Sequence, residues 1–413
     1  MGQVVSEIGD HFNSIAVLSL ALHVTGSGLA VGGVMIARTV PAILAGPISG
    51  VILDRFDRRN IMIASDLVRA AIAIAFVLVL THRQTWLLYV LSGALMFASP
   101  FFTSGRSAIL PRITTPDDLH SANALTQTTA WLTLSIGTLL GGVSTTKFGY
   151  EWAFVVNAIS FLFSAWSISR LRSPEGHFRP DRRVVTHHSA GAYWNDFRES
   201  IAYMRATPVV LAIALSLVGW ASGGGAAQIL FTLYGEKVYN AGPAGIGIIW
   251  SAAGFGLVGG GILAHRIGKR LGFSGYKNAI SLGYCVHGAA YVLFAVMPNI
   301  WLSSVFIGIS RLAMGSNNVL NRTMLLTHVP DRLRGRIFST NEMIVNAIMM
   351  ISMSAASIAT LSFSIRTIAV VAGCFSASTA VFWFWADKAG KLPEPAPEPA
   401  EDQEDYKPTA TPA

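Results

Sequence analysis

Charged residues are scarce in this chain: Asp, Glu, Lys and Arg make up 13% of its 413 residues, against about 25% in a typical soluble protein. So few charges cannot cover the surfaces of the two or three soluble domains that a chain of this length would form. Cysteine is rarer still, with only Cys285 and Cys374, both in apolar segments. A soluble globular protein and a disulfide-rich scaffold are therefore excluded.

Motifs of enzymes and of metal sites are also missing. The sequence has no G-x-x-x-x-G-K-[ST] phosphate-binding loop and no G-x-S-x-G nucleophile motif, so ATP is not expected as a direct energy source. His187 and His188 lie in a polar stretch without a second pair of ligands at metal spacing. We expect no enzymatic activity, no cofactor and no metal site.

Apolar residues, by contrast, are abundant: they make up 52% of the chain, and the mean hydropathy is +0.51. They form twelve runs, each long enough for the roughly 20 residues that a membrane-spanning helix needs. The runs do not alternate as barrel strands do, so an all-α membrane protein is predicted. The expected spans are 3–24, 29–53, 61–81, 85–109, 120–145, 151–171, 208–234, 242–264, 274–297, 300–322, 336–361 and 366–387.

The basic residues predict the topology of these spans. Most of them fall in alternate loops, whereas the other loops keep only Arg83, Lys147, Lys237 and Arg366. By the positive-inside rule, both termini lie in the cytoplasm. The same distribution accounts for the pI of about 9.7 without a nucleic-acid partner, because the basic residues are not gathered on one face.

The longest loop divides the chain into two halves. We expect a six-helix bundle at 1–171, a cytoplasmic linker at 172–207, a second bundle at 208–388 and a disordered cytoplasmic tail at 389–413. Within the linker, 193–204 has the spacing of an amphipathic helix, either at the membrane interface or under the bundle. Gly50–Arg59 and Gly261–Arg270 are similar and begin 211 residues apart, which indicates two parallel repeats.

The segment Gly50–Arg59 resembles the G-x-x-x-D-R-x-G-R-R signature of the major facilitator superfamily, with Asp57 in place of the second glycine. Four further segments are similar to the enterobactin-exporter and macrolide-efflux branch: 65–69, 106–111, 122–125 and 329–338. The resemblance covers about residues 1–390. It implies twelve transmembrane helices in two six-helix bundles, the major facilitator fold.

The resemblance also implies a cytoplasmic gate built from Gly50, Asp54, Arg55, Arg58 and Arg59. Asp54 would face the N-terminus of the eleventh span near Arg336, where helix N–H groups favour a carboxylate. The three arginines would tie the loop to neighbouring helices. Such contacts would form only when the cytoplasmic side is closed; a loop that only sets topology is compatible with the same residues.

Ionisable residues within spans are costly and are functional candidates by default. Asp10 and Glu7 in the first span are candidates for proton coupling, or are paired at the cytoplasmic mouth. Asp66 is expected to form a gating or structural network with Arg69 or Arg106 beside the signature loop, with substrate binding as the alternative.

Further polar residues are candidates for a central cavity: Arg38, Arg311, Asn317, Asn321 and Asn346. Arg38 should pair with Asp10 or meet an anionic substrate. The asparagines either line a wet cavity or hold helices together. Gly223–Gly225 is predicted to make a flexible or broken segment. Gly137–Gly142 resembles the antiporter signature G-P-x-x-G-G with Thr138 in place of proline; close packing by small residues is the alternative.

These patterns predict a secondary transporter that works by alternating access in a bacterial inner membrane, as a monomer. Proton exchange at Asp10 or Glu7 would drive efflux of a small amphipathic molecule, drug-, macrolide- or siderophore-like. An importer or a lysolipid flippase on the same fold remains open. A non-transporting membrane receptor or assembly partner is the alternative from another class.

Overall fold

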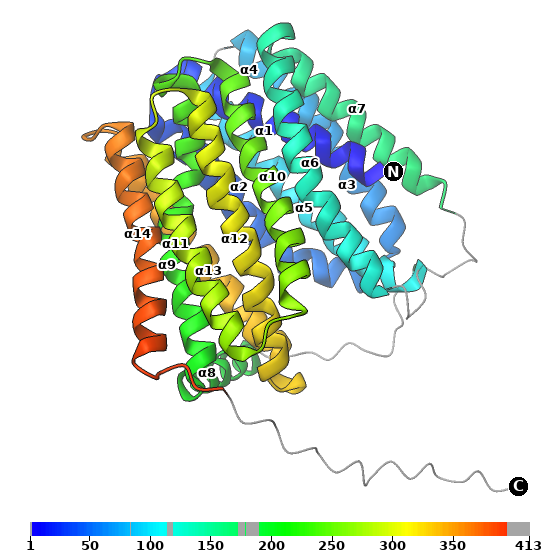
Figure 1. Ribbon diagram of the computed structural model, residues 1–413. Coiled ribbons are helices and arrows are strands. Elements are labelled where there is room, and N and C mark those ends of the chain that lie inside the picture. Colours follow the sequence, from blue (N-terminus) through cyan, green and yellow to red (C-terminus); the bar gives the residue numbers. More distant parts are fainter. Residues whose placement is uncertain (1, 83, 114–118, 172–177, 179–189, 395–413) are drawn as a thin grey trace, which may run out of the picture.

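The computed structural model describes residues 2–82, 84–113, 119–171, 178 and 190–394. This part of the chain is helical throughout, with loops between the helices (Figure 1). The helices are α1 (Gly2–Thr25), α2 (Gly28–Leu53), α3 (Arg58–Ala75), α4 (Val77–His82), α5 (Thr85–Ile113), α6 (Leu119–Phe148), α7 (Tyr150–Ser169), α8 (Ala190–Ala206), α9 (Pro208–Leu233) with the π-helical turn η1 (Tyr234–Val238), α10 (Gly242–Gly268), α11 (Phe273–Val296), α12 (Ile300–His328), α13 (Asp331–Ala359) and α14 (Ile365–Lys388).

The predicted all-α membrane fold is confirmed. Within the described residues, nine segments are long and apolar enough to cross a membrane, and α1, α6 and α12 have comparable lengths. The third predicted span is interrupted at Phe76, so that it consists of α3 and α4. Most of the predicted tail and much of the linker (172–177, 179–189 and 395–413) lie outside the described residues.

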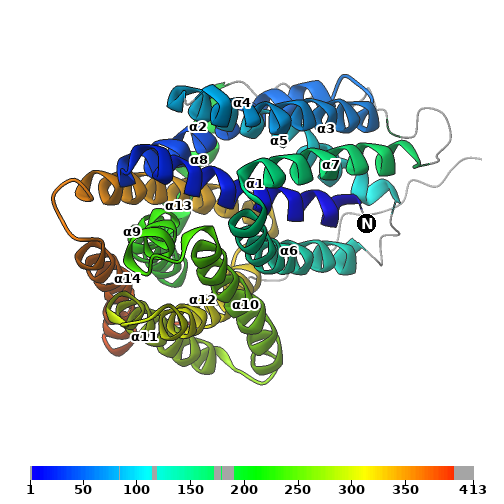
Figure 2. The same cartoon turned by 90° about the horizontal axis from the view of Figure 1, so that it is seen from above.

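The two sets of long helices repeat one packing scheme. In the first set, α1 packs on α6 and α7, α3 packs on α5 and α7, and α2 packs on α5. In the second set, α9 packs on α13 and α14, α11 packs on α12 and α14, and α10 packs on α12. Figure 2 shows the two sets side by side. Below they are called the first half (α1–α7) and the second half (α9–α14).

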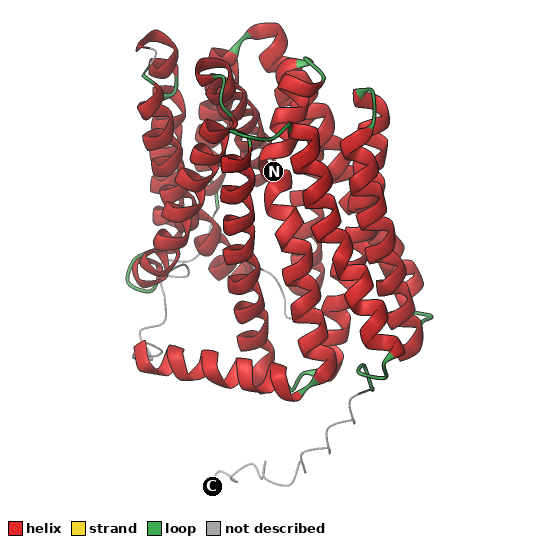
Figure 3. Ribbon diagram, turned by 90° about the vertical axis from the view of Figure 1, so that its left-hand side faces the viewer, coloured by secondary structure: helices red, strands yellow, loops and turns green. Residues whose placement is uncertain are grey.

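The helix α8 lies across one end of the molecule, as Figure 3 shows. It packs on α9 and α13, with Met204 buried and Trp194 59% exposed. This is the helix predicted at 193–204. Its contacts place it under the second half, and its exposed tryptophan also suits a membrane interface, so both predicted settings fit.

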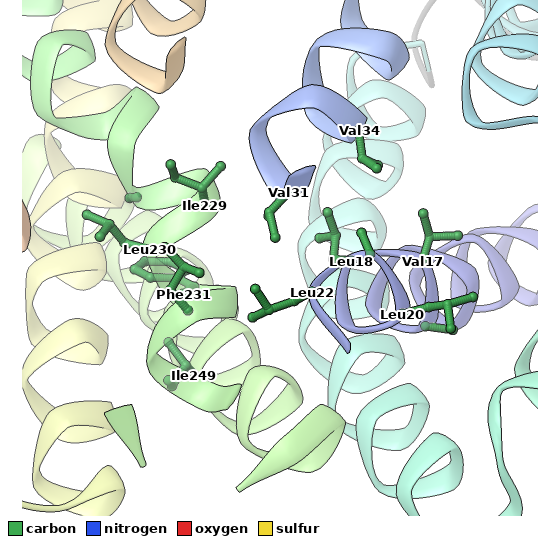
Figure 4. Close-up of a cluster of buried hydrophobic side chains, with 14 of the residues drawn as sticks. Val17, Leu18, Leu20, Leu22, Val31, Val34, Ile229, Leu230, Phe231 and Ile249 are labelled. Atoms are coloured by element: carbon green, nitrogen blue, oxygen red, sulfur yellow. The ribbon is translucent and has the colours of Figure 1, made fainter. Parts of the chain in front are cut away.

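The two halves share one hydrophobic core at the end of the molecule opposite α8. There Leu22 of α1 and Val31 of α2 point toward Leu230 and Phe231 of α9 (Figure 4). Gly28 of α2 lies against Thr360, and Ser357 of α13 donates a hydrogen bond to the Gly28 carbonyl at 3.3 Å. The halves are therefore sealed together at this end, called the sealed end below.

At the α8 end, the described core residues fall into separate clusters. One cluster contains Met62, Phe102 and Ile109 of the first half, together with Ile168 and Phe178. The other contains Met204 of α8 and residues of the second half only, such as Trp383. Because each half completes its own core here, this end can part without exposing a shared one.

The glycine-rich parts of α6 and α9 serve close packing. A methyl group at Gly142 would lie 2.5 Å from the Pro243 carbonyl of α10, so α6 and α10 touch backbone to backbone. Of the flexible or broken segment predicted at Gly223–Gly225, the break is wrong, because α9 runs unbroken through it; flexibility there stays a prediction. Gly223 and Gly225 instead let α14 and α13 approach: a methyl group at either position would lie 2.2 Å from a carbonyl oxygen, that of Ala372 or of Met349. The irregular backbone comes later, at η1.

Candidate functional site: a charged cavity between the halves

A cavity of about 460 Å³ lies where the two halves meet. The first half supplies most of its wall, through α1, α2, α3, α5 and α6, and the second half supplies α9 and α10. The lining residues are Asp10, His11, Ser14, Ile15, Met35, Arg38, Arg69, Met96, Ser99, Thr103, Leu134, Thr138, Gln228 and Trp250. The volume suits a small molecule, since ligand sites typically measure about 300–1,000 Å³.

Arg69 forms the back of this cavity and is buried. Its guanidinium pairs closely with Asp66, one helical turn earlier on α3, and lies over the rings of Phe102 at 4.6 Å and Phe161 at 4.3 Å. The Asp66 carboxylate is fully buried. Spacing by three residues on one helix brings the two side chains to the same face. The aromatic rings stabilise the buried cation by cation–π contacts in place of water.

Asp10 and Arg38 face the cavity, and in the described part of the chain each has one polar atom without a hydrogen-bond partner. The nearest cation to Asp10 is Arg69, whose Nη1 lies 3.8 Å from Asp10 Oδ2. Asp10 Oδ1 and Arg38 Nη1 have no hydrogen-bond partner among the described residues. The two side chains interact electrostatically, as the sequence predicted, although no ion pair joins them in the described part of the chain.

Glu7 lies one turn before Asp10 and is held by three helices. Its carboxylate accepts hydrogen bonds from Arg106 Nη1 of α5 at 3.1 Å, from Thr133 Oγ1 of α6 at 2.9 Å and from Gln3 Nε2 at 2.7 Å. Of the two partners expected for Asp66, Arg69 is the one that pairs with it, whereas Arg106 binds Glu7. The sequence spacing placed Glu7 and Asp10 on one helix, but it could not show which other helix supplies the partner of Glu7.

The signature loop is tied to the first half. Arg58 Nη1 donates to the Ala108 carbonyl of α5 at 3.1 Å, and Arg59 Nε donates to the Ile168 carbonyl of α7 at 3.1 Å. Asp57 caps α3 by accepting hydrogen bonds from two backbone N–H groups, with φ of −64°. Its departure from glycine is thus explained by capping, since the backbone needs no left-handed turn here.

The predicted partner of the loop lies elsewhere in this structure. Asp54 and Arg55 are exposed and have no ion pair among the described residues, and Gly50 has open space around it. Arg336 binds Glu199 of α8 at 2.6 Å. This arrangement is what the sequence predicts for a gate whose cytoplasmic side is open; the gating role itself stays a prediction.

Four of the candidates for the cavity are not among its described lining residues. Asn317 donates to the Ile280 carbonyl at 3.1 Å, and Asn321 donates to Tyr284 Oη at 3.0 Å, so both hold α12 to α11. Arg311 is 7% exposed beside Phe231 and Tyr291. Asn346 is exposed on α13. Helix periodicity shows that a residue is polar and in a span, but not which neighbour its face meets.

Two cavity residues of the second half were not predicted. Gln228 and Trp250 line the wall opposite Asp10, and the Trp250 ring packs edge-on against Phe231 with the centroids 5.0 Å apart. Gln228 is the only amide side chain in the apolar run 208–234, which was an available signal. Trp250 gave none, because a tryptophan in a span is unremarkable by itself.

The sealed end has a polar contact between the halves. Glu236 of η1 accepts a short hydrogen bond from Ser19 Oγ of α1, and Ser19 Oγ also lies 3.1 Å from Tyr150 Oη. The next residue, Lys237, binds the Gly26 carbonyl. Because η1 belongs to the second half, these contacts close the molecule over the shared core. Glu236 was not among the predicted functional residues.

These features are those of a transporter with two repeated halves around a central cavity, and comparisons with known proteins agree. The model of the Major Facilitator Superfamily matches residues 2–309 and 273–408, so the chain belongs to this family. It is a multi-pass membrane transporter of a small molecule and not an enzyme. The family resemblance read from the sequence is confirmed.

Relatives and a solved structure extend this comparison. The chain is 23% identical over 341 residues to the putative bacilysin exporter BacE of Bacillus subtilis, covering 83% of this chain and 82% of that one. It is 20% identical over 359 residues to macrolide efflux protein A of Streptococcus pyogenes, covering 85% and 86%. A bacterial homologue of the iron transporter ferroportin, solved in an inward-facing state, has a TM-score of 0.67 at 15% identity, covering 92% and 96%.

Proposed function

We propose that this chain is a proton-coupled exporter of a small amphipathic molecule, working by alternating access in a bacterial inner membrane. The observation that carries the proposal is Asp10, a carboxylate with one unpartnered oxygen in a cavity lined by both halves. Relatives named as exporters support the direction of transport. Neither a cofactor nor a nucleic acid has a part in this function, and a single chain suffices for it.

The structure corresponds, in this proposal, to the state open to the cytoplasm. The sealed end would face outward, with Glu236 and the shared core as its closure. The α8 end would face the cytoplasm, and by the positive-inside rule both termini and the basic signature loop would be on the cytoplasmic side of the membrane. Substrate would enter from that end, and the halves would then rock about the tight contact between α6 and α10.

Closure of the cytoplasmic end would use the signature loop. In the opposite state, Asp54 would no longer be exposed to water and would contact the N-terminus of α13. Arg336 would release Glu199 and bind the signature loop. Arg58 and Arg59 already anchor the loop to α5 and α7, so the first half would move as one body. Two competing partners for Arg336 make the switch bistable, as alternating access requires.

Export and its coupling can be tested in the organism that makes the protein. A strain lacking the gene should accumulate the substrate and lose it from the medium, which comparative mass spectrometry of cells and medium would detect. Restoring the wild-type gene should restore export, and a protonophore should abolish it. Asp10→Asn should fail to restore export although the protein reaches the membrane, because its amide cannot exchange a proton.

Glu151→Gln is the matched control for that variant, since Glu151 is an exposed carboxylate at the start of α7. It should export normally. Export that survives both Asp10→Asn and the protonophore would contradict proton coupling. If cells of the deletion strain contained less of the substrate than wild-type cells, rather than more, the protein would be an importer.

A further inference from the structure

The charges that face the cavity are unequal in how well they are neutralised. Arg69 is 2% exposed and has a close carboxylate partner in Asp66. Besides Arg69 and His11, the cavity is faced by the carboxylate of Asp10, whose side chain is 28% exposed and whose Oδ2 lies 3.8 Å from Arg69 Nη1, and by the guanidinium of Arg38, which is half-buried.

Both of these side chains have unused hydrogen-bonding capacity. Asp10 Oδ1 is an acceptor and Arg38 Nη1 a donor, and neither has a partner among the described residues. Enclosed charged groups without partners are costly, so a ligand that supplies both a donor and an acceptor gains from both. One that supplies only one leaves the other charge without a partner and brings a net charge into the membrane interior.

The rest of the wall suits an apolar body. Met35, Met96 and Leu134 come from three helices of the first half, and Trp250 faces them from the second half. The indole Nε1 of Trp250 has no hydrogen-bond partner in the described part of the chain, so it can donate a hydrogen bond to a ligand. The wall thus provides one negative end, one positive end and an apolar surface.

We propose that the cavity selects a zwitterion: a molecule with a primary ammonium group, a carboxylate and an apolar side chain, such as a short peptide or an amino-acid derivative. The ammonium group donates to Asp10 Oδ1, and the carboxylate accepts from Arg38 Nη1. The apolar side chain packs on Trp250 and the methionines. This inference rests on the proposed function, because it assigns the substrate class of the same cavity.

The assignment also gives the exporter its coupling. A protonated Asp10 is neutral and does not attract an ammonium group, so Asp10 must release its proton to the cytoplasm before substrate binds. After the halves rock, a proton from outside takes the carboxylate and the ammonium group leaves. One carboxylate thus holds either a proton or the substrate, and the exchange is one for one at this residue.

The test uses the full chain, purified in detergent, and three probes that differ at their charged ends: leucyl-phenylalanine, its N-acetyl form, which lacks the ammonium group, and its C-terminal amide, which lacks the carboxylate. Dissociation constants would be measured by thermophoresis at one pH. The unmodified dipeptide should bind at least tenfold more tightly than either capped form, since each cap removes one of the two charged contacts.

Two variants separate the two ends of the site. Asp10→Asn should weaken the unmodified and amide probes and leave the acetyl probe unchanged. Arg38→Gln should weaken the unmodified and acetyl probes and leave the amide unchanged. Glu151→Gln should change none of the three.

The inference is overturned if none of the probes binds, if the three bind equally, or if the variants do not discriminate between the two caps. Export in living cells is measured independently, as described above. If export depends on Asp10 but the capped probes bind as well as the dipeptide, the proposed function stands and the zwitterion falls. If the dipeptide is selected but nothing is exported, the reverse holds.

Discussion

Arg69 shows, at the scale of single residues, how this protein places a charge in a membrane. The side chain has a carboxylate at one edge and the aromatic rings of Phe102 and Phe161 on its flanks. Removing one partner of such a buried pair is more damaging than removing both, because it leaves one charge uncompensated. Asp66 is the close partner of Arg69, and Asp10, whose Oδ2 lies 3.8 Å from the same guanidinium, has its Oδ1 without a hydrogen-bond partner among the described residues.

Asp66→Asn should accordingly destabilise the protein by about 3–5 kcal/mol. Removing both charges with Asp66→Asn and Arg69→Met should recover a large part of that loss. Unfolding in detergent, followed by tryptophan fluorescence, measures both variants. Glu199→Gln is the control, because its partners are exposed and such pairs are worth roughly 0–1 kcal/mol. If the double variant is no more stable than the single one, the pair is not the reason for the burial of Arg69.

At the scale of elements, the contact between α6 and α10 is the backbone-close crossing that joins the halves. Gly142 approaches the carbonyl of Pro243. A methyl group at Gly247 would lie 2.4 Å from the carbonyl oxygen of Thr138. Small residues let membrane helices pack by dispersion forces where the hydrophobic effect is absent. The glycines that resemble an antiporter signature thus have a packing role, and Gly141 also lies against Phe12 of α1.

Gly142→Ala should lower the free energy of unfolding by about 1–3 kcal/mol through overpacking. It should also reduce the rate of transport, because the added methyl group would push α6 and α10 apart where the halves rock. Gly46→Ala is the matched control, because a methyl group there meets nothing within 4 Å; it should be neutral or slightly stabilising. Scanning fluorimetry and the export assay measure the two effects. Equal behaviour of the two variants would remove the crossing as the pivot.

At the scale of the whole molecule, the distribution of contacts defines a conformational state. The halves share a core and polar contacts at the sealed end, whereas the described clusters at the α8 end belong to one half each. Opening the sealed end must break the contact from Glu236 to Ser19 and expose residues such as Leu22, which is 4% exposed. The populations of the two states therefore change when the contacts that close either end are weakened or strengthened.

Glu236→Gln should weaken the closure and raise the population of the opposite state about tenfold, since hydrogen bonds to charged groups contribute roughly 1.5–3 kcal/mol. The readout is the labelling of Leu22→Cys by a membrane-impermeant maleimide, with Cys285 and Cys374 replaced by serine. Labelling should be faster with Glu236→Gln and unchanged with Glu151→Gln. Unchanged labelling in both variants would show that Glu236 does not hold this end.

Sequence patterns were sufficient for the class of protein and most of its elements. A long apolar run has one stable solution in a bilayer, the helix, because every backbone polar group must find its partner within the segment. That local constraint gives the spans, and repeated motifs give the two halves. Even Arg38 and Asp10 could be singled out, since a charge in a span needs a reason wherever it points.

The partners of those charges were decided only in the tertiary structure. Arg106 meets Glu7, Arg336 meets Glu199, and Asn317 faces α11 rather than the cavity. A helix allows its polar face any rotation that neighbouring helices accept, so the choice depends on contacts between residues far apart in the chain. The sequence by itself determined that this is a membrane transporter with charges to explain; packing between helices decided which charges balance one another and which remain to meet a substrate.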